Sequence, residues 1–232
     1  MWLFLLMIKK NLIVLTGAGI SAESGLKTFR DSDGLWEGFD INEVATATAW
    51  KKNPGLVLEF YNKRRQNVKE ASPNEAHFAL ASLQNDFNVQ IITQNIDDLH
   101  ERAGSKQVLH LHGEIFKMRS VKNEEVTYPI YDEIKLGDLS KDGGQLRPHI
   151  VWFEEPVPMI EEAARIVSKA DIFLITGTSL VVYPAAGLVN FVPMETPKYI
   201  IDKKIPYSGM YNLTTIENSA TEGMKEFIEM IK

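Results

Sequence analysis

Residues 11–25 read NLIVLTGAGISAESG, and this stretch decides the fold. Residues 12–15 are four consecutive apolar residues, which predicts a buried strand. A glycine-rich loop, Gly17-Ala18-Gly19, follows, and Ser21 then suits the capped start of a helix. This layout favours phosphate binding, because glycines let the backbone approach and a helix N-terminus offers free N–H groups. The letters GAGISA also match the GxGxxA dinucleotide fingerprint, although a simple tight turn would fit the same letters.

The composition is that of a globular protein with one core, or with a core and an inserted module. The chain has 232 residues, of which 44% are hydrophobic and 24% charged, a net charge of −6 and no Cys. The negative charge argues against a nucleic-acid partner. The lack of Cys excludes disulfides, thiolate metal sites and a thiol nucleophile. We expect a cytoplasmic monomer that binds no nucleic acid.

The first ten residues, MWLFLLMIKK, are apolar up to two lysines. Eight apolar residues are too few to span a bilayer, and a signal peptide would carry its positive charge before the apolar run. We interpret the segment as a lead-in to the first strand, or as an upstream extension with Met7 as the natural start. We expect no membrane partner, with a weak membrane anchor as the alternative.

Strand and helix patterns alternate along the rest of the chain. Apolar runs predict strands at residues 89–93, 108–112, 170–176 and 199–201, with strand-like composition at 147–153. Helical patterns cover residues 54–69, 72–83, 158–169 and 221–231. This alternation predicts an α/β fold with a Rossmann-like, doubly wound parallel sheet, in which ligands bind at the carboxyl ends of the strands. Polar or glycine-rich segments follow four of these strands, at residues 16–19, 93–97, 112–113 and 177–179.

Two segments depart from the alternating pattern. Residues 32–83 contain helical patterns and no convincing strand, and residues 117–146 are polar and irregular. We interpret both as insertions that form a small domain, one a helical module and the other a cysteine-free module. The larger, dinucleotide-binding domain then consists of residues 1–31, 84–116 and 147–232.

Five motifs in this order resemble the sirtuins, the NAD-dependent protein deacylases. They are GAGIS at 17–21, TFR at 28–30, TQNIDDLH at 93–100, HGE at 112–114 and GTSL at 177–180. The resemblance covers roughly residues 9–232 and implies NAD as co-substrate and acylated lysine proteins or peptides as partners. It also implies the products, which are nicotinamide, O-acyl-ADP-ribose and free lysine.

The resemblance assigns roles to individual residues. His112 would be the general base, in the pKa range that suits proton removal from a ribose hydroxyl, and Asn95 would share the catalytic site. Val151, Trp152 and Phe153 would line the acyl-lysine channel and pair with the substrate backbone as a strand. The residues expected to bind NAD are Gly17, Ala18, Gly19, Ile20, Phe29, Arg30, Trp36, Gln94, Asn95, Ile96, Asp97, Gly177, Thr178, Ser179 and Asp202. His110 is expected to be a core histidine without a catalytic role.

The chain departs from the family pattern where sirtuins usually carry two pairs of zinc-binding cysteines. Ser120, Asn123, Leu139 and Asp142 stand at the matching places, and they cannot form a normal zinc site. We therefore predict a zinc-module equivalent without zinc. Its residues expected to provide apolar packing instead are Tyr128, Pro129, Ile130, Tyr131, Ile134, Leu136 and Leu139. Glu154 also stands where the family commonly has Gly, which affects the substrate-facing segment.

Tyr61 and Arg64 bear on the choice of acyl group. They lie three residues apart on the helix predicted at 54–69, so they share a face, and a phenol with a guanidinium can bind a carboxylate. The pair resembles the Tyr-x-x-Arg of bacterial-type sirtuins that remove succinyl and malonyl groups, and Ala22 resembles the small residue that widens their acyl pocket. The alternative is an exposed basic helix face. We predict a deacylase that favours acidic acyl groups and also removes acetyl groups.

Other functional classes fit the glycine loop. A NAD-dependent oxidoreductase would place an acidic residue at the end of a second strand about 20 residues further on, where this chain has a loop and helices. A mono-ADP-ribosyltransferase and a non-catalytic NAD-sensing module remain as alternatives.

Overall fold

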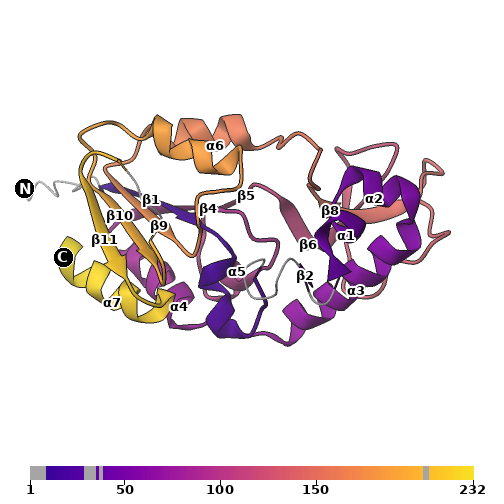
Figure 1. The fold of residues 1–232 in the computed structure, drawn as a ribbon, viewed down its shortest axis with the longest axis horizontal. Helices are drawn as coiled ribbons and strands as arrows, with labels where there is room; N and C mark the ends of the chain where they lie inside the picture. The colour runs from indigo at the N-terminus through magenta and orange to yellow at the C-terminus, as the bar shows by residue number, and fades with distance from the viewer. Residues whose placement is uncertain (1–8, 29–34, 37–38, 206–208) are drawn as a thin grey trace, which may run out of the picture.

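A six-stranded parallel sheet forms the larger part of the molecule, in the order β11-β10-β9-β1-β4-β5 (Figure 1). The computed structural model describes residues 9–28, 35–36, 39–205 and 209–232. The strands of this sheet are β1 (Asn11–Thr16), β4 (Asn88–Thr93), β5 (Val108–His110), β9 (Ile172–Thr176), β10 (Lys198–Asp202) and β11 (Leu213–Glu217). The predicted parallel α/β sheet is therefore confirmed, and the predictions made for the first eight residues lie outside the described part.

The central strand β1 is apolar on both faces because helices cover both sides of the sheet. Leu12 and Val14 pack with residues of α4 (Glu75–Ser82) and α7 (Ala220–Ile231), whereas Ile13 and Leu15 pack with residues of α6 (Ile160–Val167). Successive side chains of a strand point to opposite faces, so a run of four apolar residues satisfies both layers. Figure 1 shows α6 on one side of the sheet and α4 with α7 on the other.

The strand order indicates where a ligand would bind. From β1 the chain adds β4 and β5 on one side, then crosses to add β9, β10 and β11 on the other. Ligands of doubly wound sheets bind at such a reversal of strand order, outside the carboxyl ends of the strands. In this sheet the reversal lies between β1 and β9, whose following loops contain Gly17 and Gly177.

A second, smaller part holds a three-stranded antiparallel sheet and a group of helices. The sheet has the order β7-β6-β8, formed by β6 (Gly113–Ser120), β7 (Thr127–Pro129) and β8 (Leu146–Ile150). Against it pack α1 (Ile41–Val44), α2 (Ala47–Lys52) and α3 (Pro54–Glu70), around a core that includes Phe60 and Trp152. The start of α3 matches its sequence, because the Asn53 side chain accepts from Leu56 N–H and Pro54 occupies the first turn.

The smaller sheet includes chain that the sequence pattern assigns to the larger domain. Gly113 and Glu114 of β6 pair with Ile150 and His149 of β8 rather than joining the parallel sheet. Composition predicted the strand character of β8 correctly but did not reveal its partner. Residues 32–83 also contain a short hairpin that was not predicted, formed by β2 (Leu35–Trp36) and β3 (Phe39–Asp40).

One further expectation was wrong, and one strand was not predicted. The glycine loop continues into two short 3-10 turns, η1 (Ala18–Ile20) and η2 (Ala22–Ser24), and not into an α-helix. The Ser21 hydroxyl donates to Asp97 instead of capping a helix, and Gly25 ends the second turn at φ +86°. The edge strand β11 was also missed, because only Ile216 of its five residues is fully buried.

The remaining elements connect these parts. They are α5 (Leu99–Arg102) and the 3-10 turns η3 (Leu83–Asn85) and η4 (Ala185–Phe191). Within the described ranges, no helix has the length and apolar character needed to cross a bilayer.

Candidate active site

Three glycines bring the loops after β1 and β9 into direct contact. Gly17 N–H donates to Thr176 O at 3.1 Å, and Gly19 N–H donates to Gly177 O at 2.8 Å. A Cβ on Gly19 would lie 2.7 Å from the Gly177 Cα, and Gly177 itself has φ +68°. The glycines are therefore required by the approach of one loop to the other, a reason separate from any approach to phosphate.

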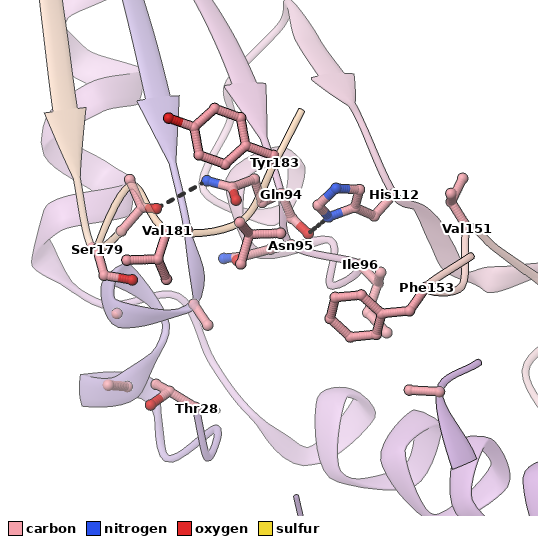
Figure 2. Close-up of a pocket in the computed structure, with 18 of the residues that line it drawn as sticks. Thr28, Gln94, Asn95, Ile96, His112, Val151, Phe153, Ser179, Val181 and Tyr183 are labelled. Carbon is pink, nitrogen blue, oxygen red and sulfur yellow. Dashed lines mark hydrogen bonds between the residues drawn. The ribbon is translucent and has the colours of Figure 1, made fainter. Parts of the chain in front are cut away.

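A cavity of about 650 Å³ opens beside this junction, and the loops at the carboxyl ends of β1, β4, β9 and β10 line it (Figure 2). It lies at the crevice expected from the strand order and is of ordinary size for a ligand site. The predicted site residues that line it are Gly17, Ala18, Gly19, Tyr61, Gln94, Asn95, Ile96, His112, Val151, Trp152, Phe153, Gly177, Thr178, Ser179 and Asp202.

His112 is held by the loop after β4. Its Nδ1 lies 3.0 Å from the Gln94 carbonyl oxygen, which can only accept, so Nδ1 carries a proton (Figure 2). In the neutral ring, Nε2 then keeps its lone pair. Burial lowers the pKa of His112, and the bond to Gln94 opposes that effect only in part. At neutral pH the ring is therefore a neutral base beside the cavity.

Gln94 connects His112 to the glycine junction, the contact of Gly17 and Gly19 with the loop after β9. Its backbone N–H donates to Thr16 O at 3.0 Å, and its side-chain Nε2 donates to Thr178 Oγ1 at 3.1 Å (Figure 2). Gln94, in the loop after β4, thus joins the end of β1 and the loop after β9 to the histidine. Its position follows from the parallel register of β1 and β4, in which Thr16 is opposite Thr93.

Asn95 and Asp97 meet at Ser21. The Asn95 side chain donates to Ser21 Oγ at 3.1 Å, and Ser21 Oγ donates to Asp97 Oδ2 at 3.1 Å. Burial raises the pKa of Asp97, while Leu99 N–H, the Arg64 charge and the Ser21 hydroxyl oppose the rise. Asn95 lines the cavity, whereas Asp97 lies behind it and holds the loop.

Besides Asp97, four predicted NAD-binding residues have no described side chain at the cavity wall. Ile20 packs in the core between the sheet and α4 with α7, so only its backbone is near the glycine loop. Phe29 and Arg30 lie outside the described residues. Trp36 is described only as backbone in β2.

The predicted substrate segment lines the cavity, but its backbone is largely occupied. Phe153 N–H donates to Ala45 O at 2.9 Å, and Phe153 O accepts from Ala47 N–H at 3.1 Å. Trp152 N–H donates to the Glu155 carboxylate at 2.9 Å, and Trp152 O accepts from Glu155 N–H. These groups of residues 152 and 153 thus already have partners within the chain. Pairing of a peptide strand with Val151, Trp152 and Phe153 stays a prediction.

Tyr61 and Arg64 are both buried on α3, so the alternative of an exposed basic face does not apply to them. Tyr61 lines the cavity with its ring centre 6.3 Å from that of Trp152. Burial raises the pKa of Tyr61, so it remains an uncharged phenol, and the nearby Arg147 and Arg64 charges oppose the rise. Arg64 does not line the cavity, and its charge also acts on Asp97.

An ion pair between the buried Arg147 and the half-buried Glu155 supports the substrate segment. The Arg147 guanidinium binds Glu155 at 2.7 and 3.1 Å and lies 3.3 Å from the centre of the Trp152 ring. This Arg thus holds Trp152 by stacking and through the carboxylate that accepts from the Trp152 N–H. The sequence patterns did not predict this pair, since the seven residues between its members gave no local signal.

Other lining residues were missed as well. They are Thr28, Ala45, Ile150, Glu155, Val157, Val181, Val182, Tyr183, Pro184, Ile201, Lys203, Lys204, Asn218 and Ala220. Asn218 follows β11, so recognising that strand would have placed this side chain at the carboxyl edge of the sheet.

Two of the four positions of the missing cysteines, Ser120 and Asp142, are joined by a hydrogen bond. Ser120 Oγ donates to Asp142 Oδ1 at 2.8 Å, and the same oxygen accepts from Gly144 N–H at 2.8 Å. Among the described residues, no group of three or more His, Asp or Glu side chains could hold a metal ion. These residues do not fit zinc. The expected apolar packing is found only in part. Ile134 is buried and Tyr128 and Ile130 are half-buried, whereas Tyr131, Leu136 and Leu139 are more than 60% exposed.

Comparison with known proteins agrees with this geometry. The Sir2 family profile matches residues 17–184. A curated NAD-dependent protein deacylase of Helicobacter pylori is 53% identical over 220 residues, covering 94% of this chain and 96% of the relative. A solved Sir2 homologue in complex with NAD superposes with a TM-score of 0.84 at 38% identity, covering 96% of this chain and 89% of that one. A solved Sir2 protein with a deacetylated p53 peptide and 3′-O-acetyl ADP-ribose gives a TM-score of 0.80 at 32% identity, covering 96% and 94%. This chain therefore belongs to the Sir2 family of NAD-dependent protein deacylases.

Proposed function

We propose that the cavity removes acyl groups from lysine side chains with His112 as the general base, and that it prefers succinyl and malonyl over acetyl groups. The observation that carries this preference is a buried, uncharged Tyr61 phenol at the cavity wall, with Arg64 three residues further along α3.

The donor groups of the cavity fit NAD. Gln94 and Asn95 supply side-chain amides, and Thr178 and Ser179 supply hydroxyls beside the glycine junction. Asp202, at the end of β10, supplies a carboxylate that can accept from both hydroxyls of a ribose. We assign the glycine loop and residues 177–179 to the phosphates and ribose, and Gln94 and Asn95 to the nicotinamide end.

His112 has the protonation state that a general base needs. Its Nδ1–H is committed to the Gln94 carbonyl, which leaves the Nε2 lone pair to take a proton. When bound, NAD supplies the ribose carbon that accepts the acyl oxygen, and the ribose hydroxyl whose proton His112 would remove. The lowered pKa of His112 keeps the base active at neutral pH.

The acyl preference follows from charge in an apolar setting. A succinyl or malonyl carboxylate is costly to bury unless it is paired. The Tyr61 phenol can donate one hydrogen bond, and Arg64 can supply the opposite charge. The Arg64 charge already acts on the Asp97 carboxylate, so an acyl carboxylate would share this cation with Asp97.

The test compares succinyl-lysine and acetyl-lysine versions of one peptide. In Arg64→Met, kcat/KM for the succinyl peptide is expected to fall at least about tenfold further than for the acetyl peptide, because a charge-assisted hydrogen bond is lost. Tyr61→Phe should show a smaller change in the same direction. Lys63→Met changes an exposed residue on the same helix and should leave both substrates unaffected.

Equal losses for the two peptides in both site variants would contradict the acyl preference. They would leave the deacylase activity itself in place. Tyr61→Phe keeps the test valid if Arg64→Met does not fold, since it removes only a hydroxyl from a buried ring.

A further inference from the structure

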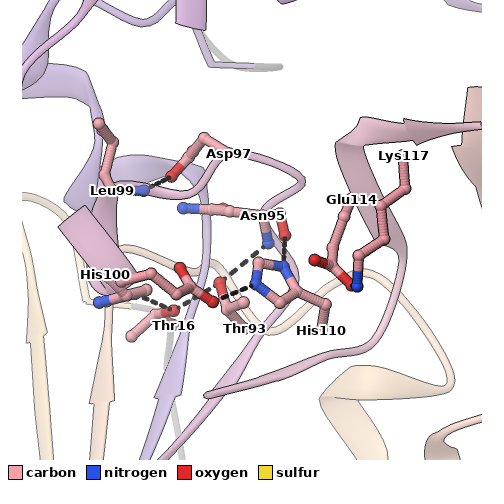
Figure 3. Close-up of polar contacts among 10 residues, drawn as sticks. Thr16, Thr93, Asn95, Asp97, Leu99, His100, His110, Glu114 and Lys117 are labelled. Carbon is pink, nitrogen blue, oxygen red and sulfur yellow. Dashed lines mark hydrogen bonds and ion pairs between the residues drawn. The ribbon is translucent and has the colours of Figure 1, made fainter. Parts of the chain in front are cut away.

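His110 lies between two groups that can only accept hydrogen bonds. Its Nδ1 is 3.0 Å from the Asn95 carbonyl oxygen, and its Nε2 is 2.8 Å from Glu101 Oε1 (Figure 3). A neutral imidazole has one N–H and can satisfy only one of them, whereas an imidazolium has two. The geometry therefore requires a proton on both nitrogens.

The charges around His110 favour this state. Glu101 comes from α5, Glu114 from β6, where it pairs with Lys117, and Asp97 from the loop after β4 (Figure 3). Burial alone would lower the pKa of His110, but the Glu101 bond and charge, the Asn95 carbonyl and Glu114 together raise it.

The neighbouring His100 provides a contrast. Its Nε2 lies 3.1 Å from the Thr16 hydroxyl, which can donate or accept, and burial lowers its pKa well below the usual range. His100 is thus the neutral histidine of the pair, and it adds no positive charge beside His110.

His110 acts on the residue that faces the cavity. The Asn95 backbone N–H donates to Thr93 Oγ1 at 3.0 Å, its carbonyl accepts from His110, and its side chain donates to Ser21. His112 binds the preceding carbonyl, that of Gln94, in the same way. Two histidines two residues apart thus hold two consecutive carbonyls of the loop after β4.

We propose that His110 is a positioning residue, held as an imidazolium by Glu101, that fixes the backbone of Asn95 and so sets the place of its amide in the cavity. The inference rests on the proposed assignment of Asn95 to the nicotinamide end of NAD. His110 does not line the cavity, so it acts through Asn95 and not on substrate. This role adds to the expectation that His110 is a core histidine without a catalytic role.

The first test reads protonation directly and needs no activity. The ¹⁵N shifts of the His110 ring in the ligand-free chain should show an imidazolium at pH 7, with an apparent pKa above the usual value of about 6.5. Glu101→Gln should lower that pKa. A neutral His110 ring at pH 7 in the wild-type chain would overturn the proposal, whatever the enzyme does.

The second test separates the two contacts. Asn carries its amide nitrogen at the place of Nδ1, so His110→Asn can keep the donor to Asn95. Gln places its nitrogen near Nε2, so His110→Gln keeps only the Glu101 contact. We expect KM for NAD to rise about five- to tenfold in His110→Gln, the effect of one lost hydrogen bond, and much less in His110→Asn, with KM for the peptide unchanged in both.

His149→Gln, a change at a half-buried histidine of β8, is the matched control and should leave KM for NAD unchanged. Equal KM values in the two His110 variants would overturn the positioning role. If neither acetyl nor succinyl peptides are turned over, binding of NAD measured by calorimetry replaces KM, so failure of the proposed function remains distinguishable from failure of this inference.

Discussion

The Glu154 carboxylate accepts two hydrogen bonds from Thr48, one from its backbone N–H at 2.9 Å and one from its hydroxyl at 2.7 Å. Thr48 lies in the first turn of α2, where N–H groups lack partners within the helix. Glu154 makes this contact from a left-handed conformation, φ +73°, that favours glycine. The side chain thus adds a link to α2 at a backbone position that is strained for any residue except glycine.

This strain and this link can be separated by two substitutions at residue 154. Glu154→Ala loses the link and keeps the strained conformation, whereas Glu154→Gly loses the link and relieves the strain. We expect Glu154→Gly to be more stable than Glu154→Ala by about 1 kcal/mol in urea unfolding. Equal stabilities, or a more stable Ala variant, would show that the backbone is not strained there.

The close contact between the loops after β1 and β9 predicts that an added methyl group destabilises the fold at Gly19 but not at Gly55. In Gly19→Ala the new methyl group would collide with the Gly177 backbone, so the free energy of unfolding should fall by about 1–3 kcal/mol. Gly55→Ala is the control, because the nearest atom to its Cβ would be Asn53 Oδ1 at 3.6 Å and it lies in α3. That change should be neutral or slightly stabilising. Similar losses in both variants would contradict the close approach of the loops.

The Arg147–Glu155 pair predicts a pH-dependent contribution to stability. Burial acts to raise the pKa of Glu155, but the bonds from Arg147 and the Trp152 N–H outweigh it, so the pKa is lowered overall. A carboxyl group whose pKa is lowered by folding stabilises the folded state fully when the pH is above its unfolded pKa of about 4.3. This stabilisation is lost as the pH falls through the pKa of the folded state.

Glu155→Gln should therefore be less stable than the wild type by about 3 kcal/mol at pH 7, because Arg147 stays buried without its counter-charge. The difference between the two proteins should hold down to about pH 5 and shrink below about pH 4.3. Urea unfolding of both proteins across this range measures it. A stability difference between the two proteins that grows as the pH falls would contradict the prediction.

The hydrogen bonds of the small antiparallel sheet predict that metal chelators change neither the stability nor the activity of the chain. Ser120 and Asp142 hydrogen-bond at the places of zinc cysteines, so treatment with EDTA should leave Tm and deacylation unchanged. Metal analysis of the purified chain should find far less than one zinc per chain. A lower Tm after EDTA, restored by adding zinc, would contradict the prediction.

Strong local patterns predicted much of the fold. The apolar run of β1, and β4 and β9 like it, needs both faces covered, and α3 has a cap, a proline and a long helical pattern. The edge strand β11 lacks such a pattern because its side chains are mostly at the surface. The antiparallel pairing of β8 with β6 depends on residues more than 25 positions apart, and no local signal reports it.

The site likewise contains residues that could be placed from sequence and features that could not. Residues at the ends of buried strands, such as Gln94 and His112, could be placed at the cavity from sequence because parallel strands bring their carboxyl ends together. The occupied backbone of Phe153 could not, since its partners Ala45 and Ala47 are more than 100 residues away. The role of His110 depends on which atoms face its two nitrogens, and this is known only once the chain is folded.

Mass spectrometry of one lysine peptide, acetylated or succinylated and incubated with NAD, tests the central claim most directly. The wild-type chain should remove the acyl group only when NAD is present, releasing one nicotinamide and one O-acyl-ADP-ribose per acyl group. His112→Ala should slow this reaction at least about a hundredfold, the usual contribution of a general base. An unchanged peptide, ADP-ribose attached to the peptide, or a wild-type rate in His112→Ala would contradict the account.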